Sequence, residues 1–436
     1  MKKILAVVSI ALASFSLSLT FAQAANIKPG SACKKSGSTY TQSGIKYTCV
    51  SVNKKLTWKV LAAAPNQSNA PTRTATTPTA TAPTATTPTA TTPTATTVVA
   101  GGVLNTPDYA PSPPDSGSDD YRCFLLDPKF TSDTFLKAVT ITPNNLEVSH
   151  HGILYKVDAA NTAATKLVDS QTKEPGWSCF GDTGIPGATA FSPAAPSSWI
   201  SFWAPGGDFK EYPANTGMKI KAGDQFILQS HFHVRSGAQK SASMKVALSL
   251  APTGSKTNEL KTLLIAAPVE LACTSSEKGP LCTRDAALAD LAKRTSTKAS
   301  LQENTLLYIC GKDPRNPVAS NTSECTSTLQ SATAIYGATG HMHQLGRTIN
   351  ITYFNKATGA STTLSSRDLW DFDNQKTDWQ SKPIQASQGD QIKVTCTYDV
   401  SLRSKLPEFR DLSPNYVVWG EGTRDEMCLA IVNYTN

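Results

Sequence analysis

Short apolar or alternating runs recur along residues 103–436, each bounded by Gly, Pro, Asn or Asp. The clearest runs are FLKAVTITP (135–143), HHGILYKVD (150–158), SWISFWAP (198–205), DQFILQSHFHV (224–234), SMKVALSLAP (243–252), RTINITYFN (347–355), DQIKVTCTYDV (390–400) and DEMCLAIVNYT (425–435). Runs of this length and spacing are typical of antiparallel β-sandwiches. The best helical pattern covers Asp285 to Arg294, in an insert between Cys273 and Cys325. The pattern therefore predicts an all-β fold with a helical insert.

This β-rich region has roughly 330 residues, which is long for one sandwich and suits two. We predict two tandem jelly-roll-like antiparallel β-sandwich domains, at residues 103–255 and 256–436. Residues 62–102 precede them and are rich in Thr, Pro and Ala. Proline at short intervals prevents helix and central strand, so this segment is expected to be an extended linker.

Residues 25–61 predict a separate small module that is too short to bury a large core. We expect it to depend on a disulfide between Cys33 and Cys49. The net charge of +8 comes from the first 104 residues, which hold ten basic residues and no acidic one. The rest of the chain has 31 basic and 33 acidic residues, which argues against nucleic-acid binding there. The basic module favours an anionic cell-wall polymer or membrane surface as partner, and a solubilising appendage is the alternative.

The first 24 residues have the organisation of a secretory signal peptide. Lys2 and Lys3 give a charged start, an apolar stretch follows, and Ala22-Gln23-Ala24 forms a small-residue cleavage site. An uncleaved membrane anchor is the competing interpretation, which the cleavage site disfavours. All ten cysteines follow this segment, and an even number favours disulfides in an oxidising compartment. We therefore expect a secreted or extracytoplasmic protein, associated with the cell envelope if the basic module binds there.

The histidines fall in three short motifs, and the chain has only six of them: His150, His151, His231, His233, His341 and His343. Strand residues i and i+2 share a face about 7 Å apart, so each H-x-H pair can contact one ion. His150 and His151 are adjacent and would both reach one metal only at a bend or strand end. A single histidine on a strand is usually structural, but three clusters without a stray histidine predict metal binding.

Imidazole nitrogen alone does not identify the metal, since it suits zinc, copper, iron and nickel. A thioether selects soft Cu(I) instead. This makes Met427, in the segment DEMC, the next residue to consider, although by itself it is more typical of a core methionine.

Together these segments resemble the copper type II, ascorbate-dependent monooxygenases, the family of peptidylglycine α-hydroxylating monooxygenase and dopamine β-hydroxylase. The resemblance covers about residues 105–436. The matching stretches, in family order, are YRCFLLDP (121–128), SHHGILY (149–155), FWAPGG (202–207), FILQSHFH (226–233), GHMHQLGR (340–347), VTCTYD (394–399) and DEMC (425–428). The sequence is most similar to the exported bacterial branch, whose members carry a longer cysteine-containing insert and the WDF segment seen at Trp370–Phe372.

The resemblance implies two copper ions per chain, on two jelly rolls that face each other across a wet cleft. The ligands implied for the electron-supplying copper are His150, His151 and His231. Those implied for the oxygen-binding copper, where substrate is hydroxylated, are His341, His343 and Met427. His233 has no counterpart in the family motif and is either a supporting group or a competing ligand to His231. Ascorbate or another one-electron donor is the implied reductant.

The family pattern also pairs Cys428 with Cys396, beside Met427. Cys123 and Cys179 each lie near a family cysteine, but their partners stay open. The insert contributes four further cysteines with three possible pairings: Cys273, Cys282, Cys310 and Cys325.

Three positions depart from the pattern of peptidylglycine hydroxylation. The Arg that binds the substrate carboxylate, two residues before the H-x-H pair, is Thr339 here. The family's Asn and Tyr after the methionine ligand are Leu429 and Ile431. Peptide amidation is therefore not expected, and no acid can be assigned to hold a substrate cation. An apolar pocket for an aromatic or aliphatic molecule without a carboxylate fits these residues better.

The sequence thus predicts a copper-dependent monooxygenase, an enzyme that uses O2 and a one-electron reductant to hydroxylate a C–H bond of a small-molecule substrate. The alternative is a non-catalytic extracytoplasmic protein that binds or stores copper with the same ligands. Presence of both complete ligand sets favours the enzyme, because storage needs no open coordination position. A wall-attached structural protein organised by the basic module ranks last.

Overall fold

The structure is a computed structural model that describes residues 31–33, 35, 38–42, 45–52, 55–60, 99–113, 118–188, 195–207, 211–234, 240–409 and 412–436. The chain forms two compact units, Met1–Thr91 and Thr92–Asn436. The expected signal peptide at 1–24 lies outside the described residues, as does the expected linker up to residue 98.

The first unit contains a three-stranded antiparallel sheet in the order β1-β2-β3. Its strands are β1 (Thr39–Gln42), β2 (Ile45–Val52) and β3 (Lys55–Val60). A disulfide joins Cys33 to Cys49, which is buried. A unit of this size can bury little apolar surface, so the covalent link supplies part of the stability that a core would give.

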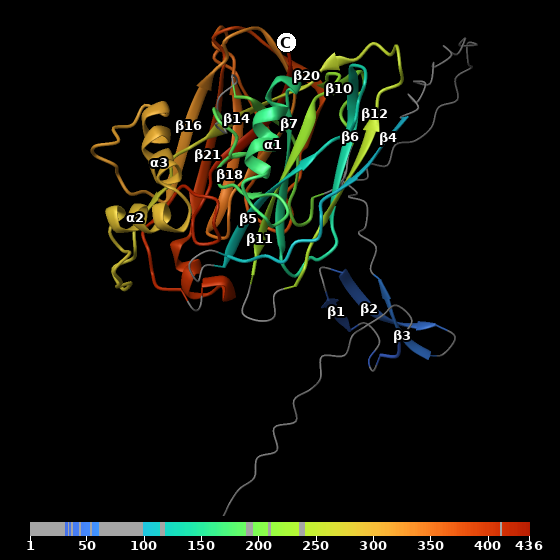
Figure 1. Cartoon of the computed structure of the whole chain (residues 1–436). Helices are drawn as coiled ribbons and strands as arrows, with labels where there is room; N and C mark the ends of the chain where they lie inside the picture. Colours follow the sequence, from blue (N-terminus) through green and yellow to red (C-terminus); the bar gives the residue numbers. More distant parts are fainter. Residues whose placement is uncertain are drawn as a thin grey trace, which may run out of the picture. The chain divides into compact units, whose positions relative to one another are not determined.

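The second unit begins with a sandwich of two five-stranded sheets (Figure 1). One sheet has the order β13-β10-β6-β12-β4, with β13 (Asn258–Glu259), β10 (Thr216–Ile220), β6 (Thr134–Pro143), β12 (Met244–Leu250) and β4 (Val99–Asn105). The other has the order β8-β5-β11-β7-β9, with β8 (Trp177–Ser178), β5 (Asp119–Leu126), β11 (Gln225–His233), β7 (Ser149–Val157) and β9 (Ser197–Trp203). The 3-10 turn η2 (Ala159–Asn161) and helix α1 (Thr162–Asp169) follow β7.

A second sandwich follows, with two four-stranded sheets. One has the order β14-β23-β17-β20, with β14 (Lys261–Ala266), β23 (Leu429–Thr435), β17 (Thr333–His341) and β20 (Asp378–Ala386). The other has the order β16-β21-β18-β19, with β16 (Thr322–Thr328), β21 (Gln391–Tyr398), β18 (Gly346–Phe354) and β19 (Ser361–Arg367). A two-stranded ladder, β15 (Glu270–Leu271) with β22 (Val417–Val418), and the 3-10 turns η3 (Val400–Ser404) and η4 (Pro407–Phe409) complete it.

Strand patterns explain these layers. In β21 every second side chain is buried, from Ile392 to Tyr398, as expected for a strand with one face on the core. β11 is buried along almost its whole length because β5 and β7 flank it and a second sheet covers it. The predicted all-β sandwich fold is confirmed. The division at residue 255 stays a prediction, since residues 92–436 form one unit.

The insert contains two helices, whereas the sequence predicted one. The predicted helix is α2 (Arg284–Arg294), and α3 (Thr297–Ile309) follows it. The hydroxyls of Thr283 and Ser296 cap their first turns. α3 was missed because its apolar residues do not follow one stripe: Leu306 is buried whereas Leu301 is exposed.

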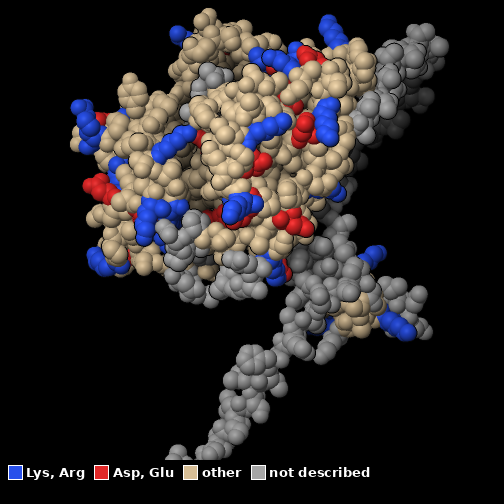
Figure 2. All heavy atoms as spheres, viewed as in Figure 1, with Lys and Arg blue, Asp and Glu red and all other residues tan. Residues whose placement is uncertain are grey.

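All ten cysteines are paired. The pairs in the second unit are Cys123–Cys179, Cys273–Cys282, Cys310–Cys325 and Cys396–Cys428. The structure thus assigns the pairings that sequence alone left open. Figure 2 shows basic and acidic side chains interspersed over the visible face of this unit, in keeping with its near-neutral balance. Among the described residues, no helix is long and apolar enough to span a membrane.

Candidate metal centres

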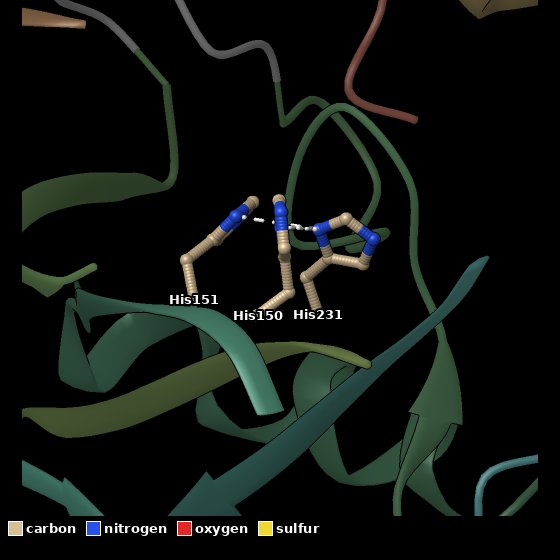
Figure 3. A group of neighbouring side chains, drawn as sticks. All are labelled: His150, His151 and His231. Atoms are coloured by element: carbon tan, nitrogen blue, oxygen red, sulfur yellow. Dashed lines mark hydrogen bonds between the residues drawn. The ribbon is translucent and has the colours of Figure 1, made fainter. Parts of the chain in front are cut away.

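Three histidines converge at the open end of the β7–β11 pair, and we call His150, His151 and His231 the His cluster. His231 lies opposite His151 in the antiparallel register. The register then shifts, so that Phe232 lies opposite Ser149 and His150 is the extra residue of a β-bulge. Because of the bulge, the adjacent residues His150 and His151 can both approach His231. The sequence required such an irregularity for both to bind one metal. Figure 3 shows the three imidazole rings side by side, with dashed lines joining their nitrogens.

The Nδ1 atoms form the centre of this cluster. Nδ1 of His231 lies 2.9 Å from Nδ1 of His150 and 3.3 Å from Nδ1 of His151. Nitrogens bound to one ion at about 2.0–2.1 Å lie roughly 3 Å apart, so this spacing fits a shared metal. Burial lowers the pKa of all three histidines, which keeps their rings neutral and their lone pairs available. The His cluster therefore fits a metal ion.

Asp119 orients the most buried member of the cluster. Its Oδ1 lies 2.9 Å from Nε2 of His231 and 3.0 Å from Nδ1 of His233. Burial by itself would raise the pKa of Asp119, but hydrogen bonds from both histidines hold it well below its ordinary value. Nε2–H of His231 thus donates to a carboxylate and Nδ1 is left for the metal, the usual arrangement of carboxylate, histidine and ion. His233 lies on this carboxylate, outside the three-histidine group.

The second group, which we call the His–Met cluster, consists of His341, His343 and Met427. β17 ends at His341, and the chain turns through His343 before β18. The imidazole centroids lie 5.3 Å apart, while Met342 between them is fully buried in the core. Gly346 ends the turn, where a Cβ would lie 2.8 Å from side-chain atoms of Met342 and Trp370. Only glycine fits there without a shift of these side chains.

Hydrogen bonds at Nδ1 direct the Nε2 lone pairs of this cluster. Nδ1 of His343 donates to the Asp425 carbonyl at 3.0 Å, and its Nε2 is buried without a partner among the described residues. Gln375 donates to the Phe372 carbonyl, so its Oε1 accepts from Nδ1 of His341 at 2.6 Å. Both Nε2 atoms therefore carry free lone pairs. An orphaned buried imidazole nitrogen fits a metal ligand.

Met427 lies on the loop that leads into β23. It is buried, and the neighbouring Cys428 is joined to Cys396 on β21. Met427 and His341 line one small cavity of about 40 Å³. Two neutral imidazoles and a thioether form a soft donor set that suits copper, Cu(I) in particular.

The two clusters lie next to each other, which differs from the wet cleft that the resemblance implied. The ring centroids of His151 and His341 are 6.4 Å apart, and both histidines line the 40 Å³ cavity. Trp199 and Phe202 of β9 pack against the cores of both sandwiches. These aromatic side chains take the place of solvent, so the cavity between the clusters is small and largely apolar.

The structure adds three functional candidates that sequence reasoning missed. Asp119 and Gln375 hold histidines of the two clusters, as described above. The third, Glu421, lines the cavity beside His341, and burial raises its pKa to about 7. From the sequence no acid could be assigned to hold a substrate cation, and the structure places Glu421 at this cavity. None of the three follows a ligand spacing, and each comes from a different segment of the chain, so no local signal could have identified them.

Removing the acceptor at Gln375 is expected to weaken metal binding at the His–Met cluster. Without it, the Nδ1 tautomer and ring orientation of His341 are no longer fixed. We expect Gln375→Leu to lower Cu(I) affinity there by roughly 10–100-fold, the usual effect of losing such a partner. Competition with a chromophoric chelator measures this. Gln375→Glu keeps an acceptor and should recover most of the affinity; equal losses in the two variants would contradict the tautomer argument.

Comparison with solved structures gives weak similarities. Procruciferin, the 11S globulin of Brassica napus, has 12% identity and a TM-score of 0.13, over 76% of this chain and 85% of that one. The coconut allergen cocosin has 8% identity and a TM-score of 0.14, over 79% of this chain and 86% of that one. Similarity at this level carries no inference about fold or function. A search of curated proteins found no match.

Comparison with protein families gives a specific result. Residues 313–436 match the family described as copper type II ascorbate-dependent monooxygenase, C-terminal domain. The matched segment includes the whole His–Met cluster, and the His cluster lies outside it. This match of the C-terminal residues supports membership of the chain in the copper type II ascorbate-dependent monooxygenase family.

Proposed function

We propose that the protein is an extracytoplasmic monooxygenase that binds two copper ions and hydroxylates a C–H bond of a small organic molecule. Family membership supports a copper- and ascorbate-dependent monooxygenase activity in general terms. The observation that carries the finer proposal is a common cavity, lined by His151 of the His cluster and by His341 and Met427 of the His–Met cluster. A protein that only stores copper has no need for two different donor sets around one enclosed space.

The chemistry that copper would supply is one-electron redox exchange and activation of O2. The overall reaction, RH + O2 + 2 e⁻ + 2 H⁺ → ROH + H2O, takes both electrons from ascorbate or another one-electron donor. The His cluster would hold one ion through three Nδ1 atoms, and the His–Met cluster the other through two Nε2 atoms and a thioether. Trp199 and Phe202 exclude water from the space between the two clusters. Glu421 can exchange a proton there near neutral pH.

The cavity walls support an apolar or aromatic substrate. Where a carboxylate anchor would be needed, Thr339 is hydrogen-bonded to Thr377 at 2.7 Å, and Leu429 and Ile431 line the cavity. A larger cavity of about 690 Å³ shares Trp199, Phe202 and Ile431 with the small one. Its remaining walls include Tyr212 and Trp379. A planar or aliphatic molecule of modest size matches the apolar part of these walls.

Export and surface attachment complete the proposal. The signal-like segment and the five disulfides support an oxidising compartment outside the cytoplasm. The basic module, with seven lysines and no acidic residue, supports attachment to an anionic wall polymer or membrane surface. Salt-dependent sedimentation of the mature chain with cell walls, lost on deletion of residues 25–61, would test the attachment.

Copper stoichiometry tests the central claim. We expect two copper ions per mature chain after loading and exhaustive dialysis, and one in His341→Ala or Met427→Ala because the His–Met cluster loses a ligand. Met342→Leu is the matched control: this methionine lies in the same motif but is buried in the core, so two ions should remain. One ion or none in the wild type would contradict the proposal. Two ions without substrate-dependent oxygen uptake across an aromatic and aliphatic panel would favour storage.

A further inference from the structure

The segment Gly420–Met427, which we call the coupling loop, belongs to the second sandwich and is linked to both clusters, to the His cluster through Asp119. At its end, Met427 is itself a member of the His–Met cluster. At its beginning, the Tyr121 hydroxyl of β5 donates to the Glu421 carbonyl, and Gly181 N–H donates to the Glu421 side chain at 3.1 Å. The loop therefore bridges the two sandwiches at the place where the clusters meet.

Thr423 joins the middle of the loop to the group that orients the His cluster. Its N–H donates to Asp119 Oδ2 at 3.0 Å, and its hydroxyl donates to Asp119 Oδ1 at 2.7 Å. The same Oδ1 accepts from Nε2 of His231 at 2.9 Å. His233 completes the group, with Nδ1 3.0 Å from Asp119 Oδ1 and 2.8 Å from Thr423 Oγ1. This gives a role to the histidine for which the family motif has no counterpart.

Two residues further on, the loop orients a ligand of the other cluster. The Asp425 carbonyl accepts from Nδ1 of His343. The Asp425 side chain accepts from Gly422 N–H at 3.1 Å and pairs with Arg294 of α2 at 2.8 Å. These bonds brace the loop internally and against the insert. Through Gly422, which precedes Thr423, the two ends of this segment are hydrogen-bonded to each other.

We propose that the coupling loop makes the two metal sites interdependent, so that copper at the His cluster raises the affinity of the His–Met cluster, with Thr423 and Asp119 as positioning residues. The inference rests on the proposed two-copper function. In each cluster, one histidine is oriented by a hydrogen-bond acceptor that either belongs to this loop or is itself hydrogen-bonded to it. Ordering the loop around one ion therefore removes part of the ordering cost at the other. By linkage the effect is reciprocal, and factors of about 5–150 are typical of such coupling.

The first test measures Cu(I) affinity of the His–Met cluster by chelator competition. We expect it to fall about 5–50-fold in His150→Ala/His151→Ala, which disables the His cluster but leaves Asp119, His231 and Thr423 in place. Thr423→Val keeps the side-chain shape but removes the hydroxyl. On this background, His150→Ala/His151→Ala should change the Cu(I) affinity of the His–Met cluster less than twofold. Thr423→Ser keeps the hydroxyl and should restore the coupling. Equal affinity with and without a functional His cluster would overturn the inference, as would full coupling in Thr423→Val.

The second test works in the opposite direction. In His343→Ala, which retains the His cluster alone, Cu(I) should slow amide hydrogen exchange of residues 421–427 at least fivefold. Adding Thr423→Val should abolish this slowing, and unchanged slowing would overturn the inference. Absence of Cu(I) binding at either cluster is a separate result, which would overturn the proposed function and the coupling with it.

Discussion

Lowering the pH from 7.5 to 5.0 is expected to destabilise the metal-free protein by about 4 kcal/mol through His341 and His343 alone. Burial lowers the pKa of His341 to about 4 and that of His343 to about 3. In the unfolded chain both have a pKa of about 6.5. At pH values between the folded and the unfolded pKa, both histidines are protonated in the unfolded chain but neutral in the folded protein. Their contribution to stability is thus complete above pH 6.5 and is lost as the pH falls toward 4 and 3.

Urea denaturation of the copper-free protein at pH 7.5, 6.5 and 5.0 measures this effect. The buried histidines of the His cluster act in the same direction. Glu421 and Glu426, with pKa raised to about 7 and 8, act in the opposite direction, because their protonation favours the folded state as the pH falls. The double variant His341→Gln/His343→Gln isolates the predicted share. It should reduce the pH dependence by about 4 kcal/mol, and an unchanged dependence would contradict the assignment.

The sequence predicted those parts of the protein that repeat or cluster along the chain. Hydrophobic runs such as 224–234 and 390–400 correspond to β11 and β21, since strand periodicity depends on local burial on a sheet face. The histidine motifs likewise identified residues that the structure brings together, among them His150, His151 and His231. The sequence also indicated that His150 and His151 can bind one metal only at a bend or strand end. It could not locate the bulge, because the bulge depends on the register between β7 and β11.

What sequence reasoning missed arises from contacts between distant segments. Asp119 meets Thr423 across 304 positions, and Gln375 reaches His341 from a turn 34 residues away. The small cavity between the clusters has the same origin, because the aromatic residues of β9 pack against both sandwiches. Such contacts depend on how the sandwiches pack, and no periodicity or spacing in one segment specifies that.

Glu426 is the clearest case of a role that the sequence did not reveal. The sequence pattern drew attention to Met427, the next residue, but gave no indication of what Glu426 does. Its carboxyl group is fully buried and accepts three backbone hydrogen bonds. Oε1 accepts from Leu345 N–H at 2.7 Å, and Oε2 from the N–H groups of His343 and Met427 at 2.9 and 3.0 Å. One side chain therefore fixes the turn that carries His343 and the loop that carries Met427. This carboxyl group thus ties together the two backbone segments that carry His343 and Met427.

Glu426→Ala is accordingly expected to destabilise the protein by roughly 3–6 kcal/mol, because three buried N–H groups lose their acceptor. It should also remove copper from the His–Met cluster while the His cluster keeps its ion. Urea denaturation and copper stoichiometry measure the two effects. The matched control is Glu324→Ala on β16, whose partly exposed side chain pairs with Lys393 at 2.6 Å and should contribute at most about 1 kcal/mol. If Glu426→Ala lost no more stability than this control and still bound two ions, the carboxyl group would not be the element that joins His343 to Met427.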